Sequence, residues 1–510
     1  MATPSEKLAQ SLELLKALQS GKGIAVIKAD ELARTHRDRL LENGFIKEVL
    51  KGWYISCRPD ERPGDTTSWY MSFWYFASIY IKSRFEDEWC LSPEQSLSLH
   101  SGNYTVPHQL LVRSPKANNN CIMLLHSTSF LDLKLNIPTR DDRIDMNGIQ
   151  LYSLAEGLIT VGEDFFFRQP TDARTCLSMI SDASELLRKL LEGGKSVVAG
   201  RMAGAFRNLG NSKIADEIVK TMKSAGYDVR ETDPFNEKIK IDFKSRQISQ
   251  YANRIKLMWF QFRQTVIDNF PAANELPKDI DKYLQLVDES YAEDAYHSLS
   301  IEGYNVTADL IERVRSGNWN PENDEDDKKE INALAARGYY QAFQAVKQSI
   351  KSILEGKNAG EVVDDDITTW YRELFAPSVA AGLLKASDLA GYRNGLVYIK
   401  GSMHTPLNPV AVRDTMPILF DLLKEEKEPS VRAVLGHFIL VYIHPYMDGN
   451  GRLGRFLFNT MLASGGYVWT IIPMGKRDEY MLALERASVG QDITDFSKFL
   501  SNLLNEKKVE

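Results

Sequence analysis

Apolar side chains recur every three or four residues toward both ends of the chain, and they alternate with polar ones in short stretches between. Leucines at helical spacing predict a first helix over residues 6–20, and residues 29–43 predict a second one. Residues 45–56 alternate apolar and polar positions about a turn at Lys51 and Gly52, which predicts two paired strands. We therefore expect residues 1–60 to form a small domain of two helices and two strands.

The middle of the chain follows a different pattern. Residues 61–195 consist of short apolar runs separated by polar turns, which predicts a mixed α+β domain. The apolar run at 68–81 is only 14 residues long. A spanning helix needs roughly 20 residues, so we interpret this run as a buried core element. Helical spacing resumes over residues 196–244, a predicted linker subdomain, and continues through residues 245–510. The expected architecture is multidomain and mainly α, with an all-helical C-terminal domain behind an α+β region.

Charge and composition exclude several classes of protein. The chain has 510 residues, with 62 Lys plus Arg against 69 Asp plus Glu, and a net charge of −7. This balance gives no general attraction to nucleic acid or anionic lipid, so any such contact has to be local. The four cysteines form no CxxC pair, which argues against a zinc knuckle or a disulfide framework. The first residues lack the basic segment and apolar run of a signal peptide. We expect a cytoplasmic protein that binds no membrane.

Residues 430–462 contain the densest set of chemically useful side chains. Apolar positions at helical spacing predict a helix that ends at His444, because Pro445 cannot continue it. A second helix is predicted from about Arg452, and the chain enters it through Gly-Asn-Gly at 449–451. The first N–H groups of a helix have no partner within it, and glycines let a ligand approach the backbone closely. The pattern therefore predicts a phosphate site at this helix start.

The residues around the helix start supply the other parts that phosphoryl-type transfer needs. Arg452 and Arg455 lie three apart on the helix, so both can reach one polyphosphate. His444 is a base that titrates near neutrality, and Asp448 offers a hard oxygen ligand for Mg²⁺. A polar turn between two helices would not by itself require all of these residue types. The pattern indicates an enzyme that acts on a phosphate-containing substrate.

At these residues the chain resembles the Fic family, whose signature HPFx(D/E)GNGRxxR stands here as HPYMDGNGRLGR at 444–455. The departure, Tyr446 in place of Phe, falls on a packing position. The resemblance extends over roughly residues 245–505 and includes residues 392–409, which look like the family's substrate-aligning flap, and RDEYMLALERA at 477–487. It implies a protein adenylyltransferase, an enzyme that moves AMP from ATP to a Tyr, Thr or Ser hydroxyl of a protein target while pyrophosphate leaves. Transfer of another phosphate-containing group is disfavoured by the intact GNGR.

The resemblance also implies a role for each residue of the signature. His444 would remove the proton of the target hydroxyl, and Asp448 would hold Mg²⁺ against the phosphates of ATP. Arg452 and Arg455 would neutralise the β- and γ-phosphates. The other nucleotide-binding candidates are Gly449, Asn450 with its side-chain amide, Gly451, Asn459 and Tyr480. For Asn459 and Tyr480, simple helix packing is an equal alternative. His437 precedes His444 on the same helix without a metal-binding spacing, so we interpret it as structural.

A second match to the family lies upstream of the signature. Ser298, Glu302 and Gly303, in the segment SLSIEGYN, fit the family's inhibitory pattern (S/T)xxxE(G/N). The resemblance implies that a helix ends here and that Glu302 pairs with Arg455 in place of the γ-phosphate. A plain helix end with Gly303 as its C-cap is the alternative interpretation.

The first 60 residues resemble the winged helix-turn-helix at the front of AbiEi-type antitoxins, with His36, Arg37 and Arg39 on the second helix. This region has ten Lys or Arg and eight Asp or Glu, so DNA contact and a protein-interaction module stay open as alternatives. The competing function for the chain is a DNA-binding transcriptional regulator or antitoxin-like protein. Self-modification and a homo-oligomer also stay open.

Overall fold

The computed structural model describes residues 3–19, 25–61, 65–235, 249–317 and 331–506. The chain divides into two compact units, one of residues 1–244 with 398–405 and one of residues 245–397 with 406–510. The predicted boundaries at 60 and 195 fall inside the first unit and stay predictions.

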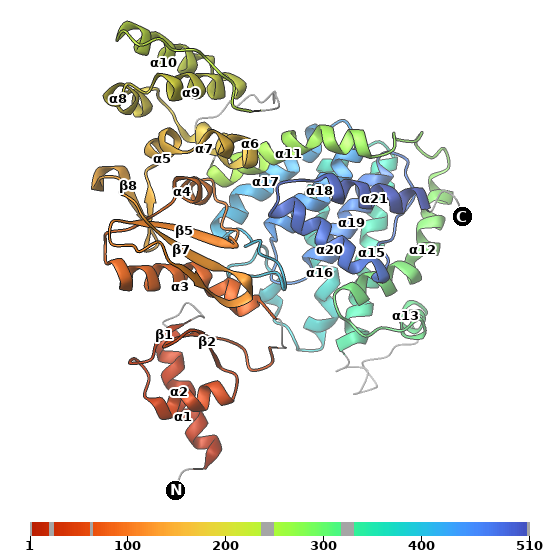
Figure 1. Cartoon of the computed structure of the whole chain (residues 1–510). Helices are drawn as coiled ribbons and strands as arrows, with labels where there is room; N and C mark the ends of the chain where they lie inside the picture. Colours follow the sequence, from red (N-terminus) through yellow and green to blue (C-terminus); the bar gives the residue numbers. More distant parts are fainter. Residues whose placement is uncertain (1–2, 20–24, 62–64, 236–248, 318–330, 507–510) are drawn as a thin grey trace. The chain divides into compact units, whose positions relative to one another are not determined.

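Two helices and a small sheet form the beginning of the first unit (Figure 1). The elements are α1 (Pro4–Gln19), β1 (Val26–Lys28), α2 (Arg34–Glu42), β2 (Ile46–Leu50) and β3 (Trp53–Ser56). The strands are antiparallel in the order β1-β3-β2. The sequence pattern did not predict β1, because three residues are too few to show alternation. A winged helix-turn-helix stays a prediction for this region.

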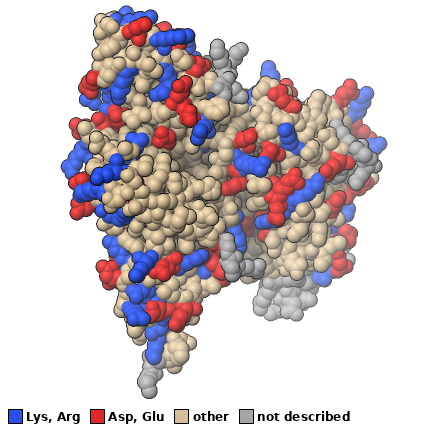
Figure 2. All heavy atoms as spheres, viewed as in Figure 1, with Lys and Arg blue, Asp and Glu red and all other residues tan. Residues whose placement is uncertain are grey.

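The basic side chains of α2 that are candidates for DNA contact bind to the protein itself. Arg37 Nη1 donates to the Ala29 carbonyl at 2.7 Å, and Arg39 Nη1 donates to Ser11 Oγ at 2.7 Å. A ring nitrogen of His36 lies 2.9 Å from the same hydroxyl. Figure 2 shows charged side chains of both signs over these N-terminal elements. The contacts with Ser11 join α2 to α1, and the contact with Ala29 joins α2 to the segment before it. These contacts give DNA binding no support.

A mixed sheet and a hairpin form the middle of the first unit. The elements are α3 (Thr67–Phe85), β4 (Cys90–Leu91), α4 (Pro93–His100), β5 (Gln109–Ser114), β6 (Cys121–Met123), η1 (Leu125–Ser127), β7 (Ser129–Lys134), η2 (Arg140–Asp142), β8 (Arg143–Met146) and β9 (Ile149–Tyr152). The sheet has the order β4-β5-β7-β6, in which β5 and β7 are parallel, and β8 pairs with β9. The apolar run at 68–81 lies in α3, where Trp69, Phe73 and Phe76 are at most 1% exposed, which confirms a core element. Among the described residues, no helix has both the length and the apolar character needed to cross a bilayer.

Short helices complete the first unit. They are α5 (Leu154–Thr160), α6 (Glu163–Arg168), α7 (Pro170–Met179), α8 (Ser184–Glu192), α9 (Ser196–Asn208) and α10 (Ser212–Ser224).

The secondary-structure elements described in the second unit are all helices (Figure 1). Its elements are α11 (Gln250–Asn269), α12 (Ile280–Ile301), α13 (Ala308–Arg315), α15 (Ile331–Leu354), α16 (Ala359–Ala380), η3 (Ala386–Leu389), α17 (Pro409–Glu425), α18 (Pro429–Ile443), α19 (Asn450–Ala463), η4 (Met474–Lys476), α20 (Arg477–Ser488) and α21 (Thr494–Glu506). The hairpin of α18 and α19 lies at the centre, because α19 contacts α12, α15 and α16 while α18 contacts α11, α17, α20 and α21. Nearly every side chain of the two central helices is buried. A buried hairpin of this kind holds the loop between its helices in one position.

Candidate functional site

The site begins with the loop between α18 and α19. His444 ends α18 in the left-handed conformation (φ 55°, ψ 62°), and Gly449 leads into α19 with φ 84°. Asn450 fixes the loop, because its Oδ1 accepts the Tyr446 N–H at 3.0 Å and its Nδ2 donates to the Tyr446 carbonyl at 2.9 Å. The side-chain amide expected to contact phosphate is therefore engaged by the loop. The first turn of α19 remains available for an anion, because its backbone N–H groups have no partner within the helix.

His444 has the geometry of a neutral base. Its Nδ1 lies 3.2 Å from the Val441 carbonyl, which can only accept, so Nδ1 carries the proton and Nε2 holds the free lone pair. Burial, with a smaller effect from the Arg393 charge, lowers the pKa of His444 to about 4, although the Val441 hydrogen bond opposes the shift. The sequence pattern led us to expect a group that titrates near neutrality, and the lowered pKa of His444 departs from that expectation because the sequence does not show how the half-buried ring is packed.

Arg393 supports the backbone of this loop, and sequence reasoning missed it. Its Nε donates to the His444 carbonyl at 2.7 Å, and its backbone N–H donates to the Pro445 carbonyl at 3.0 Å. The side chain is 3% exposed. Arg393 precedes the signature by about 50 residues and lies in the segment 392–409 that resembles the family's flap, but that resemblance gave Arg393 itself no role.

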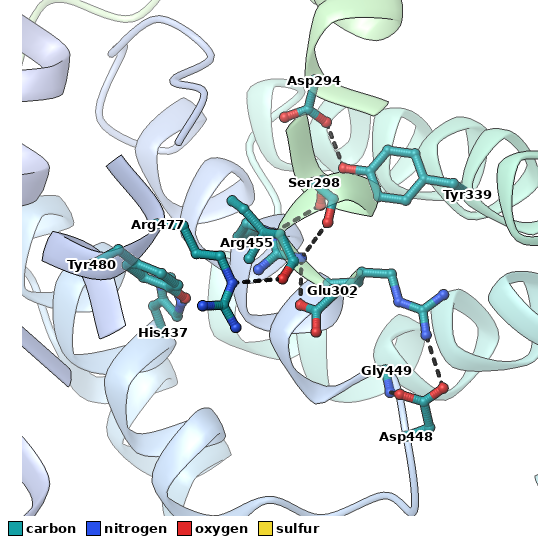
Figure 3. Close-up of polar contacts among 12 residues, drawn as sticks. Asp294, Ser298, Glu302, Tyr339, His437, Asp448, Gly449, Arg455, Arg477 and Tyr480 are labelled. Atoms are coloured by element: carbon teal, nitrogen blue, oxygen red, sulfur yellow. Dashed lines mark hydrogen bonds and ion pairs between the residues drawn. The ribbon is translucent and has the colours of Figure 1, made fainter. Parts of the chain in front are cut away.

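Arg455 is held by the end of α12 (Figure 3). Its Nε donates to Ser298 Oγ at 2.8 Å, and its Nη2 donates to the Ser298 carbonyl at 3.0 Å and to Glu302 Oε1 at 2.7 Å. Glu302 is the C-cap of α12, and Gly303 follows with φ 90°, a conformation that suits glycine. The structure thus brings the Ser298 to Gly303 segment onto a residue of the signature 153 positions away.

The Glu302 carboxylate lies against the first turn of α19. A Cβ atom on Gly451 would come within 2.3 Å of Glu302 Oε1, so only glycine leaves room for the carboxylate. Burial raises the pKa of Glu302, but the charges of Arg455 and Arg452 and the hydrogen bond from Arg455 outweigh it, and the net shift is downward. An ionised carboxylate therefore occupies the place where the helix start favours an anion.

Arg452 is buried without enough partners. The side chain is 1% exposed, and its guanidinium lies 5.3 Å from the ring centre of Tyr304 and 5.0 Å from that of Phe375. Its Nη2 donates to Asp448 Oδ2 at 3.2 Å, whereas Nε and Nη1 have no hydrogen-bond partner among the described residues. Buried donors without a partner are rare and costly, and they point to a ligand. Tyr304 directly follows the inhibitory pattern, which is the one signal that could have identified it.

The two weaker nucleotide candidates, Asn459 and Tyr480, have hydrogen-bond partners within the protein. Asn459 joins α19 to the next segment, because its Nδ2 donates to the Thr470 carbonyl at 3.0 Å and its Oδ1 accepts the Thr470 N–H at 2.7 Å. Tyr480 is 2% exposed, and its hydroxyl lies 2.8 Å from Nε2 of His437. Both side chains are therefore engaged inside the protein.

Asp448 is the acidic side chain of the loop. Its Oδ1 accepts the Gly449 N–H at 2.6 Å, and the side chain is 63% exposed. Within the described ranges, no group of three or more His, Cys, Asp or Glu could hold a metal ion. Mg²⁺ is commonly bound by one or two carboxylates together with substrate phosphates, so a single exposed carboxylate beside an anion site fits that ion.

A cavity of about 760 Å³ opens beside Asp448. It is lined by residues of α16, of the segment from Leu384 to Gly395, of α17 and of the loop between α18 and α19, including Tyr371, Phe375, Tyr392, Met447 and Asp448. Its polar lining includes Asp448 of the loop and Tyr392, Arg393 and Asn394 of the segment expected to align the substrate. The cavity thus belongs to the same site.

Comparison with known proteins gives a partial match. Residues 362–462, about a fifth of the chain, match the Fic/DOC family. The chain is 27% identical over 224 residues to the protein adenylyltransferase fic-1 of Caenorhabditis elegans, covering 42% of this chain and 40% of that protein. It is 30% identical over 219 residues to the protein adenylyltransferase Fic of Drosophila willistoni, with the same shares of 42% and 40%. The chain thus spans about two fifths of the length of these relatives.

A solved structure of Fic-1 residues 134–508 from C. elegans is 18% identical and covers 67% of this chain and 93% of that one, with a TM-score of 0.37.

The match to the Fic/DOC family includes the whole segment from His444 to Arg455. It begins after Glu302 and stops before Tyr480.

Proposed function

We propose that the second unit transfers AMP from ATP to a hydroxyl group of a protein target and that Glu302 holds this activity in check. The observation that carries the proposal is the pair of buried arginines at the start of α19. Arg455 is bound to a carboxylate, and two N–H groups of Arg452 find no hydrogen-bond partner in the part of the chain that the structure describes. A polyphosphate in the place of the carboxylate would satisfy both guanidinium groups and the free N–H groups of the helix start. Sequence relatives named as protein adenylyltransferases support this reaction for the matched region.

His444 acts as the base in this reaction. Its free Nε2 accepts the proton of the target hydroxyl as the hydroxyl oxygen forms a bond to the α-phosphorus of ATP. The bond from that phosphorus to the bridging oxygen breaks, and pyrophosphate leaves with the electron pair. A ring that is already neutral at pH 7 needs no prior loss of a proton.

The remaining residues of the site bind and orient the substrate. Arg452 and Arg455 neutralise the outer phosphates, and the first turn of α19 offers N–H groups to their oxygens. Asp448 would hold Mg²⁺, which supplies charge neutralisation on the phosphates when bound. Arg393 keeps the His444 backbone in place through the His444 carbonyl.

Inhibition follows from the position of Glu302. Its carboxylate pairs with Arg455 and fills the space in front of Gly451, so ATP cannot place a phosphate there without displacing it. Removing the carboxylate frees Arg455 but leaves the helix start unchanged.

The test compares AMP incorporation in three variants, measured by mass spectrometry on the protein itself and on a cell lysate with added ATP and Mg²⁺. We expect Glu302→Gly to raise incorporation at least about tenfold, since freeing one charge-assisted bond corresponds to roughly 1.5–3 kcal/mol. Arg455→Ala should abolish it even in the Glu302→Gly background. A folded Glu302→Gly protein no more active than its parent would refute the inhibitory role, and no incorporation in any variant would refute AMP transfer.

A further inference from the structure

The end of α12 is held by side chains from two other helices. The last four carbonyl groups of a helix have no partner within it, and in α12 these are the carbonyls of residues 298–301. The middle two accept backbone N–H groups from the turn that follows the helix. The Ser298 carbonyl accepts from Arg455 Nη2 of α19 at 3.0 Å. The Ile301 carbonyl accepts from Arg477 Nε, at the start of α20, at 3.0 Å (Figure 3). All four carbonyls are therefore satisfied, two of them by arginines far away in the chain.

A second contact joins the same last turn to η4, the short helix that leads into α20. The backbone N–H of Met474 donates to Nδ1 of His297 at 3.2 Å. The direction of this bond is fixed, because a backbone N–H can only donate. Met474 and Arg477 are three residues apart, so one stretch of chain supplies both contacts.

These contacts lie beside the inhibitory carboxylate but do not depend on it. Glu302 directly follows Ile301, so the bond from Arg477 fixes the backbone from which the carboxylate extends. Arg477 also brings a positive charge to the C-terminal end of α12, where the helix dipole favours one. A phosphate that displaces the carboxylate from Arg455 does not by itself break the bond between Arg477 and Ile301.

From this geometry we infer that Arg477 is a positioning residue for the inhibitory carboxylate, because it anchors the end of α12 through the Ile301 carbonyl. The contact of His297 with Met474 supports the same anchor. The anchor keeps the carboxylate close to its site when a nucleotide competes for that site, so the carboxylate returns readily. Breaking it activates the enzyme while both members of the inhibitory ion pair remain intact. The inference rests on the proposed function and adds a second point of control to it.

The test uses the full chain with Glu302 present and measures initial rates of AMP incorporation together with the affinity for ATP by titration calorimetry. We expect Arg477→Met to raise both about threefold to tenfold, a modest effect because the lost hydrogen bond belongs to a side chain that is 43% exposed. Arg477→Lys can still donate to the carbonyl and should stay close to the parent in both measurements. Unchanged values for Arg477→Met, in a chain that Glu302→Gly activates, would overturn the inference.

The Glu302→Gly background shows whether Arg477 acts through the carboxylate. Without the carboxylate there is nothing left to position, so Arg477→Met should leave the rate and the ATP affinity of the Glu302→Gly protein unchanged. A fall of either quantity in that background would show that Arg477 serves the nucleotide or the fold directly, and the positioning role would be wrong.

Two matched controls come from the same helix and should change nothing in either background. Asp478→Asn removes the ion pair between Asp478 Oδ1 and Arg477 Nη1, which are 3.5 Å apart, but keeps the bond to the carbonyl. Arg486→Met removes another partly exposed arginine of α20, one that pairs with Asp495. A rise in either control as large as that in Arg477→Met would contradict a specific anchor at Ile301.

Amide hydrogen exchange without nucleotide separates this inference from the proposed function. The N–H groups of residues 302–304 bond to the last carbonyls of α12, so their exchange reports whether that end stays closed. Arg477→Met should speed their exchange, whereas Arg486→Met should not. If this result appears in a chain that neither binds ATP nor transfers AMP, the proposed function fails while the anchor stands. Unchanged exchange in Arg477→Met would overturn the anchor even if AMP transfer is observed.

Discussion

In the sequence, the basic residues of α2 and those of α19 are both candidates for contact with phosphate. In the structure, the two sets differ in burial and in hydrogen-bond partners. Arg37 and Arg39 are partly exposed and donate to nearby protein oxygens. Arg452 and Arg455 are at most 4% exposed, and within the described residues two donors of Arg452, Nε and Nη1, have no hydrogen-bond partner. Burying a charge without full compensation is costly, so a chain keeps such an arrangement where a ligand completes it. Unmet hydrogen bonds therefore mark a binding site better than the number of positive charges does.

The largest effect should come from His444→Ala in the Glu302→Gly background. Removing a general base costs about 10²–10⁴-fold in rate, while ATP binding should persist because both arginines remain. Initial rates of AMP transfer and ATP titration together check this. Transfer at the parent rate would show that another group accepts the proton.

The pH dependence of the same reaction follows from the lowered pKa of His444, about 4. The base is active when neutral, so the rate should be flat from about pH 6 to 8 and fall only as the pH approaches 4. A pH profile of kcat/KM measures this, with circular dichroism confirming that the fold persists. A midpoint near 6.5, the ordinary value for histidine, would contradict the buried, hydrogen-bonded ring.

Replacing each arginine of α19 by methionine should change the free energy of unfolding by different amounts. Arg455→Met should lower the free energy of unfolding by about 2 kcal/mol. It leaves the Glu302 carboxylate, which is about one third exposed, without its ion-pair partner. Arg452→Met should cost less than about 1 kcal/mol, because it also removes two donors that have no partner. Chemical denaturation measures both. Equal losses would mean that Arg452 is as well satisfied as Arg455.

Asp448→Ala should have a smaller effect, confined to the dependence of AMP transfer on Mg²⁺. Loss of one carboxylate ligand should raise the Mg²⁺ concentration needed for half-maximal transfer without changing ATP binding in the absence of metal. A Mg²⁺ titration of the Glu302→Gly protein with and without the substitution tests this. Identical curves would exclude Asp448 as a ligand.

The smallest effect should come from substitutions of the basic residues of α2. Because Arg37 and Arg39 are engaged within the protein, we expect no gel shift of DNA at 0.15 M salt, and alanine at either position should lower stability rather than affinity. If binding does occur, its affinity should fall with salt by about 0.9 log unit per log unit for each phosphate neutralised. A salt-dependent shift that Arg37→Ala abolishes would reverse the conclusion drawn from α2.

Local patterns predicted much of the helical hairpin but not its environment. The helix that ends before Pro445 and the helix start after Gly449 both follow from residue spacing or from a residue that cannot continue a helix. The contacts of Arg393 with the His444 backbone could not be predicted, because they join segments far apart in the chain.

Burial and side-chain partners were the other missing information. The pKa of His444, the use of the Asn450 amide by the loop and the pairing of Tyr480 with His437 depend on packing, which no single sequence window contains. The match of Ser298 and Glu302 to a pattern predicted a contact between Glu302 and Arg455. Only the structure shows that the carboxylate also faces Gly451.

The carboxylate of Glu302 is part of the same molecule as the guanidinium that it contacts, and this makes it a tethered ligand. Its docking is unimolecular, so diluting the protein does not weaken it. A tether of this kind gives a local concentration on the order of millimolar or above, and under the proposed function a free nucleotide would compete with that value rather than with zero. The fraction of open sites would then be set by the nucleotide concentration, by its affinity and by anything that moves the end of α12. A stiffer or looser α12 would retune the threshold without any change in the residues that touch the nucleotide.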